Sequence, residues 1–305
     1  MKKRGTPIHG WIALDKPEGI GSTQALAKVK HLLQPEKAGH GGTLDPLASG
    51  LLPIALGEAT KTVAWAMDGA KTYQFTIRWG EERSTDDREG EVIRQSDARP
   101  AIIDIESILH QFKGSISQVP PAFSALKLGG ERAYDLARSG QAVDLAARTV
   151  IIDRLVFVDG PDADHARFAV DCGKGTYIRA LARDMARALG TAGHVSALRR
   201  TRVGPFGESH MISLETLAEM RHKAPGDNAM KGVLHPIETV LDGIPALAVT
   251  DVGAQRLKQG QKVLLRGANA PVAQDAVLVT WDGKPLGICS IEQGSLTPKR
   301  LFNLS

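Results

Sequence analysis

A glycine-rich segment at residues 39–50 contains the side chain in this sequence that is best placed to do chemistry. It reads Gly-His-Gly-Gly-Thr-Leu-Asp-Pro-Leu-Ala-Ser-Gly, so four glycines surround one carboxylate, Asp45. Glycine lets a backbone approach a ligand closely, and Pro46 biases Asp45 away from the helical conformation. A carboxylate held in this way suits a nucleophile or a general base. The structural alternative is an Asx-type turn capped by Asp45, and local chemistry alone slightly favours it.

Periodic segments on either side of residues 39–50 could position this carboxylate. Residues 23–33 carry apolar side chains at helical spacing and are followed by Pro35, which predicts an amphipathic helix. Residues 73–79 alternate apolar with polar side chains, which predicts a half-buried strand. By this pattern alone, Tyr73 is a core residue.

A strand, a glycine turn and a helix are predicted further along the chain. Residues 167–172 alternate in polarity, Gly-Lys-Gly follows, and a helix opened by Thr176 ends near Gly190. One edge of this helix is basic, with arginines four residues apart at Arg179, Arg183 and Arg187. A cation in the first turn of a helix is electrostatically unfavourable, which suggests a specific partner for Arg179. The alternative is a surface arginine that serves solubility, and local chemistry alone favours it.

The order of these elements indicates the fold class and two domains. Strands and helices alternate irregularly, which favours an α+β protein with a mixed sheet over a doubly wound parallel one. Residues 223–228 have the composition of a loop, and a separate β-rich module is expected to begin near Ile244. In this module Asp282-Gly283 predicts a β-hairpin. The predicted domains are therefore residues 1–243 and 244–305.

Composition sets limits on function. The 305 residues include 42% hydrophobic and 24% charged side chains, which excludes disordered and fibrous classes. No apolar run is long enough to cross a bilayer, and two distant cysteines support neither a disulfide framework nor a zinc site, so a cytoplasmic location is expected. The net charge is +4, with acids concentrated at residues 81–91 and basic side chains in several clusters. A polyanionic partner and an ordinary solvated surface explain this pattern equally well.

Several motifs together resemble the TruB family of tRNA pseudouridine synthases. Residues 39–46, followed by Ser-Gly-Leu-Leu-Pro at 49–53, resemble the catalytic motif of that family. The other matching motifs occur in the family order, and they are Lys16-Pro17, Lys71-Thr72-Tyr73, Pro-Pro-Ala-Phe-Ser-Ala-Leu-Lys at 120–127, Gly-Thr-Tyr-Ile-Arg at 175–179 and Leu-Arg-Arg-Thr at 198–201. They cover most of residues 10–205. The C-terminal module resembles a PUA domain through a weaker signal.

The resemblance implies a fold, a reaction and a catalytic site. The fold would be a mixed, mainly antiparallel sheet with flanking helices, and the reaction would turn a uracil on its ribose without a cofactor or a metal. Asp45 would be the catalytic carboxylate, and Arg179 would pair with it and keep it ionised. Tyr73 would stack on the uracil and act as an acid or base. Tyr177 and Leu198 would wall the pocket.

The resemblance also implies that the partner is tRNA, bound by a protein that is expected to be monomeric. The target would be uridine 55 in the T loop, extruded from its stack before reaction. His40 would enter the loop and replace lost stacking, and Asp87 would help to hold the extruded bases. An insertion at about residues 128–150 would grip the stem-loop. Phosphate contacts are expected from Lys16, Lys61, Arg132, Arg199, Arg200 and Arg202.

Two other classes of function compete with this one. A non-catalytic protein that binds or folds tRNA could have the same fold and surface. A carboxylate-based glycosidase would need a second catalytic acid near Asp45, and no motif supplies one with comparable clarity.

Overall fold

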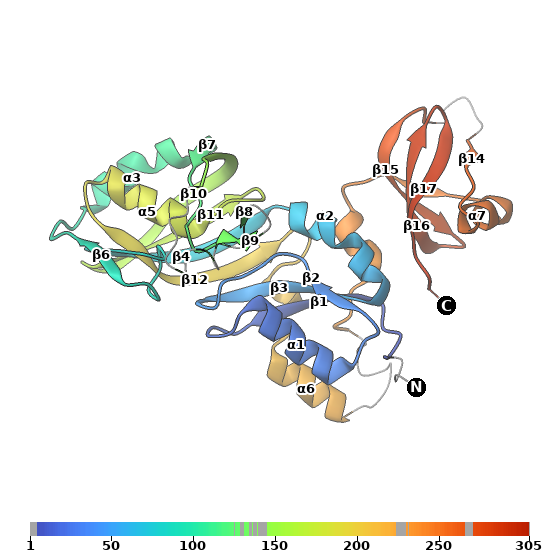
Figure 1. The fold of residues 1–305 in the computed structure, drawn as a ribbon, viewed down its shortest axis with the longest axis horizontal. Coiled ribbons are helices and arrows are strands. Elements are labelled where there is room, and N and C mark those ends of the chain that lie inside the picture. The colour runs from blue at the N-terminus through green and yellow to red at the C-terminus, as the bar shows by residue number, and fades with distance from the viewer. Residues whose placement is uncertain are drawn as a thin grey trace.

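Two β-sheets dominate the computed structural model, which describes residues 5–124, 126–128, 131–133, 136, 139, 145–223, 230, 232–265 and 271–304. A large sheet with helices around it forms most of the molecule, and a smaller sheet near the C-terminus lies beyond helix α2 (Val63–Asp68) (Figure 1). The predicted α+β class is confirmed.

The large sheet is mixed and mainly antiparallel. Its eight strands run in the order β1-β3-β12-β4-β11-β10-β7, with β2 paired to β3. Within this sheet, the one parallel pair among the described strands joins β3 and β12. The strands are β1 (Gly10–Lys16), β2 (Ala38–His40), β3 (Ala48–Leu56), β4 (Lys71–Trp79), β7 (Gly114–Gln118), β10 (Arg148–Asp162), β11 (His165–Cys172) and β12 (Gly193–Val203).

Strand β4 is central to this sheet and follows the predicted alternation. Tyr73, Phe75 and Ile77 are buried, whereas the polar residues between them are partly or fully exposed. Phe75 stacks on Phe168 of β11 at a ring-centroid distance of 5.2 Å. The apolar face of β4 therefore belongs to the main core, and the side chain of Tyr73 lies on the same side of the sheet as Phe75 and Ile77.

Helices pack around this sheet in two groups. Helix α5 (Ile178–Ala188) packs on β12 and β4, and α3 (Ile102–Ile108) lies near β10. Helix α1 (Ser22–Leu33) packs beside α6 (Leu214–Lys223), below β1 and β3 in Figure 1. The predicted helices at 23–33 and after Thr176 are confirmed. Gly190 takes a φ of 70° just after α5, as a C-terminal cap requires.

Strands β3 and β12 approach each other so closely that one residue must be glycine. Gly50 pairs with Arg200, takes a φ of 98°, and has no room for a side chain because a Cβ atom would lie 2.2 Å from the Arg200 carbonyl oxygen. This contact brings the segment after Asp45 against the strand that carries Leu198.

Short elements connect these layers. The described elements outside the two main sheets include the hairpins β5 (Glu81–Arg83) with β6 (Val92–Gln95) and β8 (Lys127–Leu128) with β9 (Glu131–Arg132), and the 3-10 helices at Gly57–Thr62, Leu109–Phe112, Glu208–His210 and Ile237–Leu241. Residues 129–130, 134–135, 137–138 and 140–144 of the predicted insertion at about 128–150 lie outside the described residues. No helix in the described part of the chain is long and apolar enough to cross a membrane.

The C-terminal sheet has five strands in the order β13-β15-β16-β17-β14, with one helix packed against it. Asp282 and Gly283 take φ angles of 50° and 70° between β15 and β16, which is the geometry of a type I′ turn at the predicted hairpin. These elements are β13 (Ala246–Ala248), α7 (Asp251–Lys258), β14 (Val263–Leu264), β15 (Gln274–Trp281), β16 (Lys284–Glu292) and β17 (Ser295–Leu301).

The two sheets share an apolar interface and a polar clamp. Leu278, Ile288 and Phe302 from the C-terminal part pack in one buried cluster with residues such as Trp11 of β1. Beside this cluster, Lys61 donates to the Glu58 carboxylate at 2.5 Å and to the Leu301 carbonyl at 2.6 Å. The same carboxylate accepts from the Asn303 amide at 2.7 Å. Lys61 therefore holds the C-terminal tail in this structure.

The clamp predicts a pH dependence of stability. Burial opposes ionisation of Glu58, but the bonds from Lys61 and Asn303 outweigh it and hold the pKa of Glu58 below its ordinary 4.5. Because the folded pKa is depressed, this stabilisation is present above pH 4.5 and is lost as pH falls through the folded value. We expect the Tm difference between the wild type and Glu58→Gln to be steady above about pH 5 and to narrow from about pH 5 to about pH 3. A difference that stays constant over this range contradicts the assignment.

Candidate active site

A pocket of about 420 Å³ opens where the segment after β2, the end of α2 and the start of α5 meet β4 and β12. Its lining includes Asp45, Lys71, Tyr73, Tyr177, Arg179 and Leu198. The structure therefore brings together all five residues that were predicted for the catalytic site and the pocket wall.

An ion pair between Asp45 and Arg179 lies at the centre of this lining. Nε of Arg179 is 2.9 Å from Oδ2 of Asp45. The Arg179 side chain is only 4% exposed, whereas that of Asp45 is 37% exposed and remains open to the pocket. Asp45 thus makes a directional contact with a distant helix, unlike the carboxylate of a simple Asx turn, and has one side free for a ligand.

Contacts to the neighbouring backbone hold Asp45 in place. The Ser22 hydroxyl donates to the Leu44 carbonyl at 2.9 Å and accepts from the Leu44 amide at 2.7 Å. Gly42, three residues before Asp45, takes a φ of 121°. Glycine tolerates this angle, whereas other residues rarely adopt it. The N-cap of α1 is Gly21, so Ser22 lies in the first turn of this helix. Sequence periodicity gave no signal for its contact with the chain beside Asp45.

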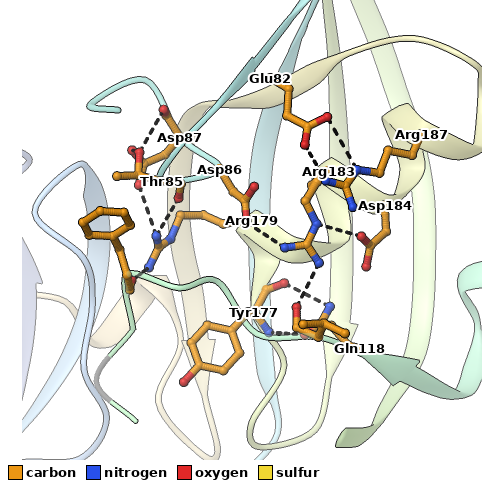
Figure 2. A network of polar contacts seen from close by, with 12 residues as sticks. Glu82, Thr85, Asp86, Asp87, Gln118, Tyr177, Arg179, Arg183, Asp184 and Arg187 are labelled. Atoms are coloured by element: carbon orange, nitrogen blue, oxygen red, sulfur yellow. Dashed lines mark hydrogen bonds and ion pairs between the residues drawn. The ribbon is translucent and has the colours of Figure 1, made fainter. Parts of the chain in front are cut away.

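The Arg179 guanidinium is fixed by three further oxygen atoms (Figure 2). It donates to the carbonyls of Thr85 at 2.7 Å and Phe123 at 2.9 Å, and it lies 3.5 Å from an Asp87 carboxylate oxygen. Asp87 itself accepts from the Thr85 hydroxyl at 2.5 Å. With its fork directed in this way, Arg179 presents Nε to Asp45 in one orientation.

The basic edge of α5 is neutralised by the acidic segment that follows β4. Arg183 is 2.9 Å from Asp86, and Arg187 pairs with Glu82 (Figure 2). Burial raises the pKa of Asp86 to about 6, although Arg183 opposes the shift. Neither a polyanion contact nor a solvated surface therefore describes Arg183, because its charge is buried and paired within the protein. The acids at 82–87 pair with this edge and so position the helix that carries Arg179.

Tyr73 contributes a buried ring to the pocket. It pairs across the sheet with Arg200 and is 9% exposed. Burial raises the pKa of Tyr73, although the nearby Arg200 opposes that shift. The side chain is therefore a protonated phenol at neutral pH, which suits stacking and hydrogen-bond donation.

A buried glutamine fixes the backbone of Tyr177, which precedes α5. The Tyr177 amide donates to Oε1 of Gln118 at 2.8 Å, and Nε2 of Gln118 donates to the Tyr177 carbonyl at 3.1 Å. Gln118 is 2% exposed and lies at the end of β7. Sequence analysis did not single out this residue, because a glutamine at a strand end has no distinctive pattern.

Two of the predicted phosphate contacts are buried, so those predictions were wrong. Lys16 is fully buried and donates to the Pro17 carbonyl at 2.9 Å and the Ile20 carbonyl at 2.7 Å, and burial lowers its pKa to about 8. Arg200 is 1% exposed and donates to backbone carbonyls, including those of Leu51 and Gly42. Both cations hold the backbone around the pocket and present no charge to a phosphate.

The other residues predicted to touch RNA differ in their exposure and in their contacts within the protein. Asp87 is 3% exposed and supports Arg179, so it offers no surface to extruded bases, and Lys61 is committed to the clamp. Arg199 pairs with Asp15 through two contacts at 3.0 and 3.1 Å and remains partly exposed. Arg202 is exposed, and the side chain of Arg132 lies outside the described part.

His40 lies on β2, outside the pocket lining, and is half-buried opposite Ile54 of β3. Its Nδ1 is buried without a hydrogen-bond partner among the described residues. Burial, and then the nearby Arg200, lower its pKa below 6.5, so the imidazole is neutral at pH 7.

Comparisons with known proteins agree with this geometry. Residues 30–178 match the TruB family pseudouridylate synthase (N terminal domain), residues 179–242 match the tRNA pseudouridylate synthase B C-terminal domain, and residues 245–302 match the Pseudouridine synthase II TruB C-terminal domain. The chain is 57% identical to the tRNA pseudouridine synthase B of Bradyrhizobium diazoefficiens, over 98% of this chain and 87% of that protein. It is 52% identical to the protein of the same name from Brucella melitensis, over 99% of this chain and 98% of that one.

The fold comparison gives a consistent result. A chain in the crystal structure of a Cbf5-Nop10-Gar1 complex superposes with a TM-score of 0.75 at 26% identity, over 97% of this chain and 85% of that one. Fold, site and matches together define a pseudouridine synthase, which is an isomerase. Within that class, the chain belongs to the TruB family.

Proposed function

We propose that this enzyme converts uridine 55 in the T loop of tRNA to pseudouridine, with Asp45 as the catalytic carboxylate and without a cofactor. The observation that carries the proposal is the 2.9 Å contact between Asp45 and the buried Arg179 at a pocket of nucleobase scale. The relatives named tRNA pseudouridine synthase B support tRNA as the substrate.

The proposed reaction needs one carboxylate and a pocket that shields the base. The uridine leaves its stack, at a cost of a few kcal/mol, and enters the pocket. With Asp45 acting at C1′, the bond between N1 and C1′ breaks, the uracil turns, and a bond forms between C5 and C1′. The proton leaves C5 and N1 gains one, so no outside atom or electron is needed. In this scheme Arg179 orients the carboxylate, and Tyr73 stacks on the uracil.

Several parts of the surface would then contact RNA. A neutral His40 ring beside glycines suits insertion into the loop, where it would replace lost stacking. Arg202 and the exposed part of Arg199 are the remaining candidates for phosphate contacts among the described arginines of the 199–202 cluster. We assign residues 1–243 to catalysis and residues 244–305 to a PUA-like RNA-binding domain, in a monomeric cytoplasmic protein.

The test is an assay of the purified protein on unmodified T-arm RNA, with pseudouridine located by base-resolved chemical mapping. The proposal predicts pseudouridine at position 55 and at no other uridine of the stem-loop. Binding without product favours the alternative, a non-catalytic protein that binds or folds tRNA. A glycosidase is less consistent with this pocket. It would need a second acid that is shielded from water and can donate a proton. The acid that lines the pocket besides Asp45 is Asp68, whose side chain is 60% exposed and paired with Lys174.

Gln118 is expected to be a positioning residue for this reaction. Gln118→Ala removes two hydrogen bonds to the Tyr177 backbone, and the Tyr177 amide loses its acceptor, whereas the Tyr177 carbonyl still accepts from the Leu181 amide. We therefore expect the free energy of unfolding to fall by about 1–3 kcal/mol. A shift of the pocket wall should lower kcat by about 10-fold. Both are measured at 25 °C, by denaturant titration and single-turnover kinetics. A kcat equal to that of the wild type in a destabilised variant would show that Gln118 supports only folding.

A further inference from the structure

The cations that line the pocket differ in their freedom to meet a substrate. Arg179 and Arg200 are buried, with their guanidinium groups directed at protein oxygens. Lys71 is 7% exposed and donates to the carbonyls of Met67 and Gly69. Lys174 is the exception among the described cationic residues of the lining, because 66% of its side chain is exposed.

Lys174 forms an ion pair between two segments that line the pocket. Its Nζ lies 2.8 Å from Oδ1 of Asp68, at the end of α2, and the Asp68 side chain is 60% exposed. Lys174 belongs to the turn between β11 and α5, and Asp68 lies 106 residues earlier. The pair therefore joins the two segments through side chains that both face solvent.

The chemistry of this pair allows it to exchange partners. An exposed ion pair contributes little to stability, so its opening costs little. Lys174 stands between Gly173 and Gly175, and Gly175 takes a φ of 80° with open space around it. A lysine ammonium is a mobile point charge that binds phosphate readily.

We propose that Lys174 leaves Asp68 and binds a backbone phosphate next to the nucleotide that enters the pocket. This inference rests on the proposed function, because a nucleotide whose base enters the pocket keeps its phosphates outside. Asp68 holds the lysine in the free enzyme and competes with the phosphate for it. The ligand is thus a phosphodiester of the RNA, bound by an exchangeable cation.

The two partners are predicted to have opposite effects on RNA binding. Lys174→Gln removes a phosphate contact and should raise the Kd by about 3- to 10-fold. It should also reduce the slope of log Kd against log salt by about 0.7–0.9, the value for one phosphate. Asp68→Asn releases the lysine and removes a negative charge, so it should leave the Kd unchanged or lower it by about twofold.

The experiment measures binding of a T-arm stem-loop by fluorescence anisotropy over a series of salt concentrations. All proteins carry Asp45→Asn, so that no turnover disturbs the equilibrium. Asp164→Asn and Arg99→Gln are the matched controls, because they break an exposed ion pair beside Trp79, at the end of β4 away from Tyr73. These controls change the net charge by the same amounts.

If the Lys174–Asp68 pair has only a structural role, the two variants give a different binding result. If the pair only braces the two segments, both replacements break it and both weaken binding. Weaker binding by Asp68→Asn, or an unchanged Kd and salt slope in Lys174→Gln, overturns the proposal. The proposed function has its own test in product formation by the wild type, so its failure is distinguishable from failure of this exchange.

Discussion

Replacement of Asp45 by asparagine is expected to abolish pseudouridine formation while RNA binding persists. Asp45 is the carboxylate that faces both the pocket and Arg179, and an amide cannot supply its negative charge at C1′. Removal of a reacting group commonly costs an enzyme orders of magnitude in rate, so we expect kcat to fall by about 10⁴-fold or more. The measurement is single-turnover conversion of T-arm RNA at saturating enzyme.

The geometry indicates that Asp45→Asn will keep the fold. Asparagine has the same shape, and its amide oxygen can still accept a hydrogen bond from Arg179. The other partners of Arg179, among them the Thr85 and Phe123 carbonyls, do not depend on residue 45. Unfolding transitions of the wild type and the variant should therefore lie close together.

Asp164→Asn is the matched control for this variant, because it removes a carboxylate from an exposed pair with Arg99. The control should have the kcat of the wild type. If Asp45→Asn retains more than a few per cent of the wild-type rate on the same RNA, the chemistry depends on a different group and the mechanism is wrong.

The parts of the fold that were predictable from sequence are those in which local pattern and tertiary packing agree. Strand β4 alternates in polarity because one face meets the core, and the turn at Asp282-Gly283 follows from backbone geometry alone. The juxtaposition of Asp45 with Arg179 was expected from motif resemblance, because no period in the sequence relates the two residues.

The errors concern charged side chains that the fold buries. Arg200 donates to the carbonyls of Leu51 and Gly42, which only the tertiary structure brings within its reach. Lys16 donates to nearby carbonyls in the sequence, those of Pro17 and Ile20, but only tertiary packing buries it. The pairing of Arg183 with Asp86 has the same origin, since it joins a helix to a turn far away in the chain. Charge clustering in a sequence reports composition, and it does not show which charges are already paired.

Arg179→Lys is expected to lower kcat by about 100-fold, which is the second largest effect. A lysine keeps the positive charge but has a single ammonium group. The planar guanidinium of Arg179 contacts Asp45 and also donates to the Thr85 and Phe123 carbonyls, and one ammonium cannot make all three contacts. Asp45 would lose its fixed orientation, and a misplacement of about 1 Å can cost about 100-fold in rate. Single-turnover rates on T-arm RNA measure the effect.

Arg183→Lys separates the catalytic part of that effect from a loss of stability. Arg183 lies one helical turn after Arg179 and is also buried, and it donates to Asp86 and to the Val119 carbonyl at 2.9 Å each. Each replacement leaves buried acceptors without a donor, so both variants should lose about 1–3 kcal/mol of unfolding free energy. Arg183 has no contact with Asp45 among those the structure describes, so its replacement should change kcat by less than about threefold. Equal losses of kcat in the two variants would show that α5 acts only as a scaffold, and that the contact between Arg179 and Asp45 has no special part in the reaction.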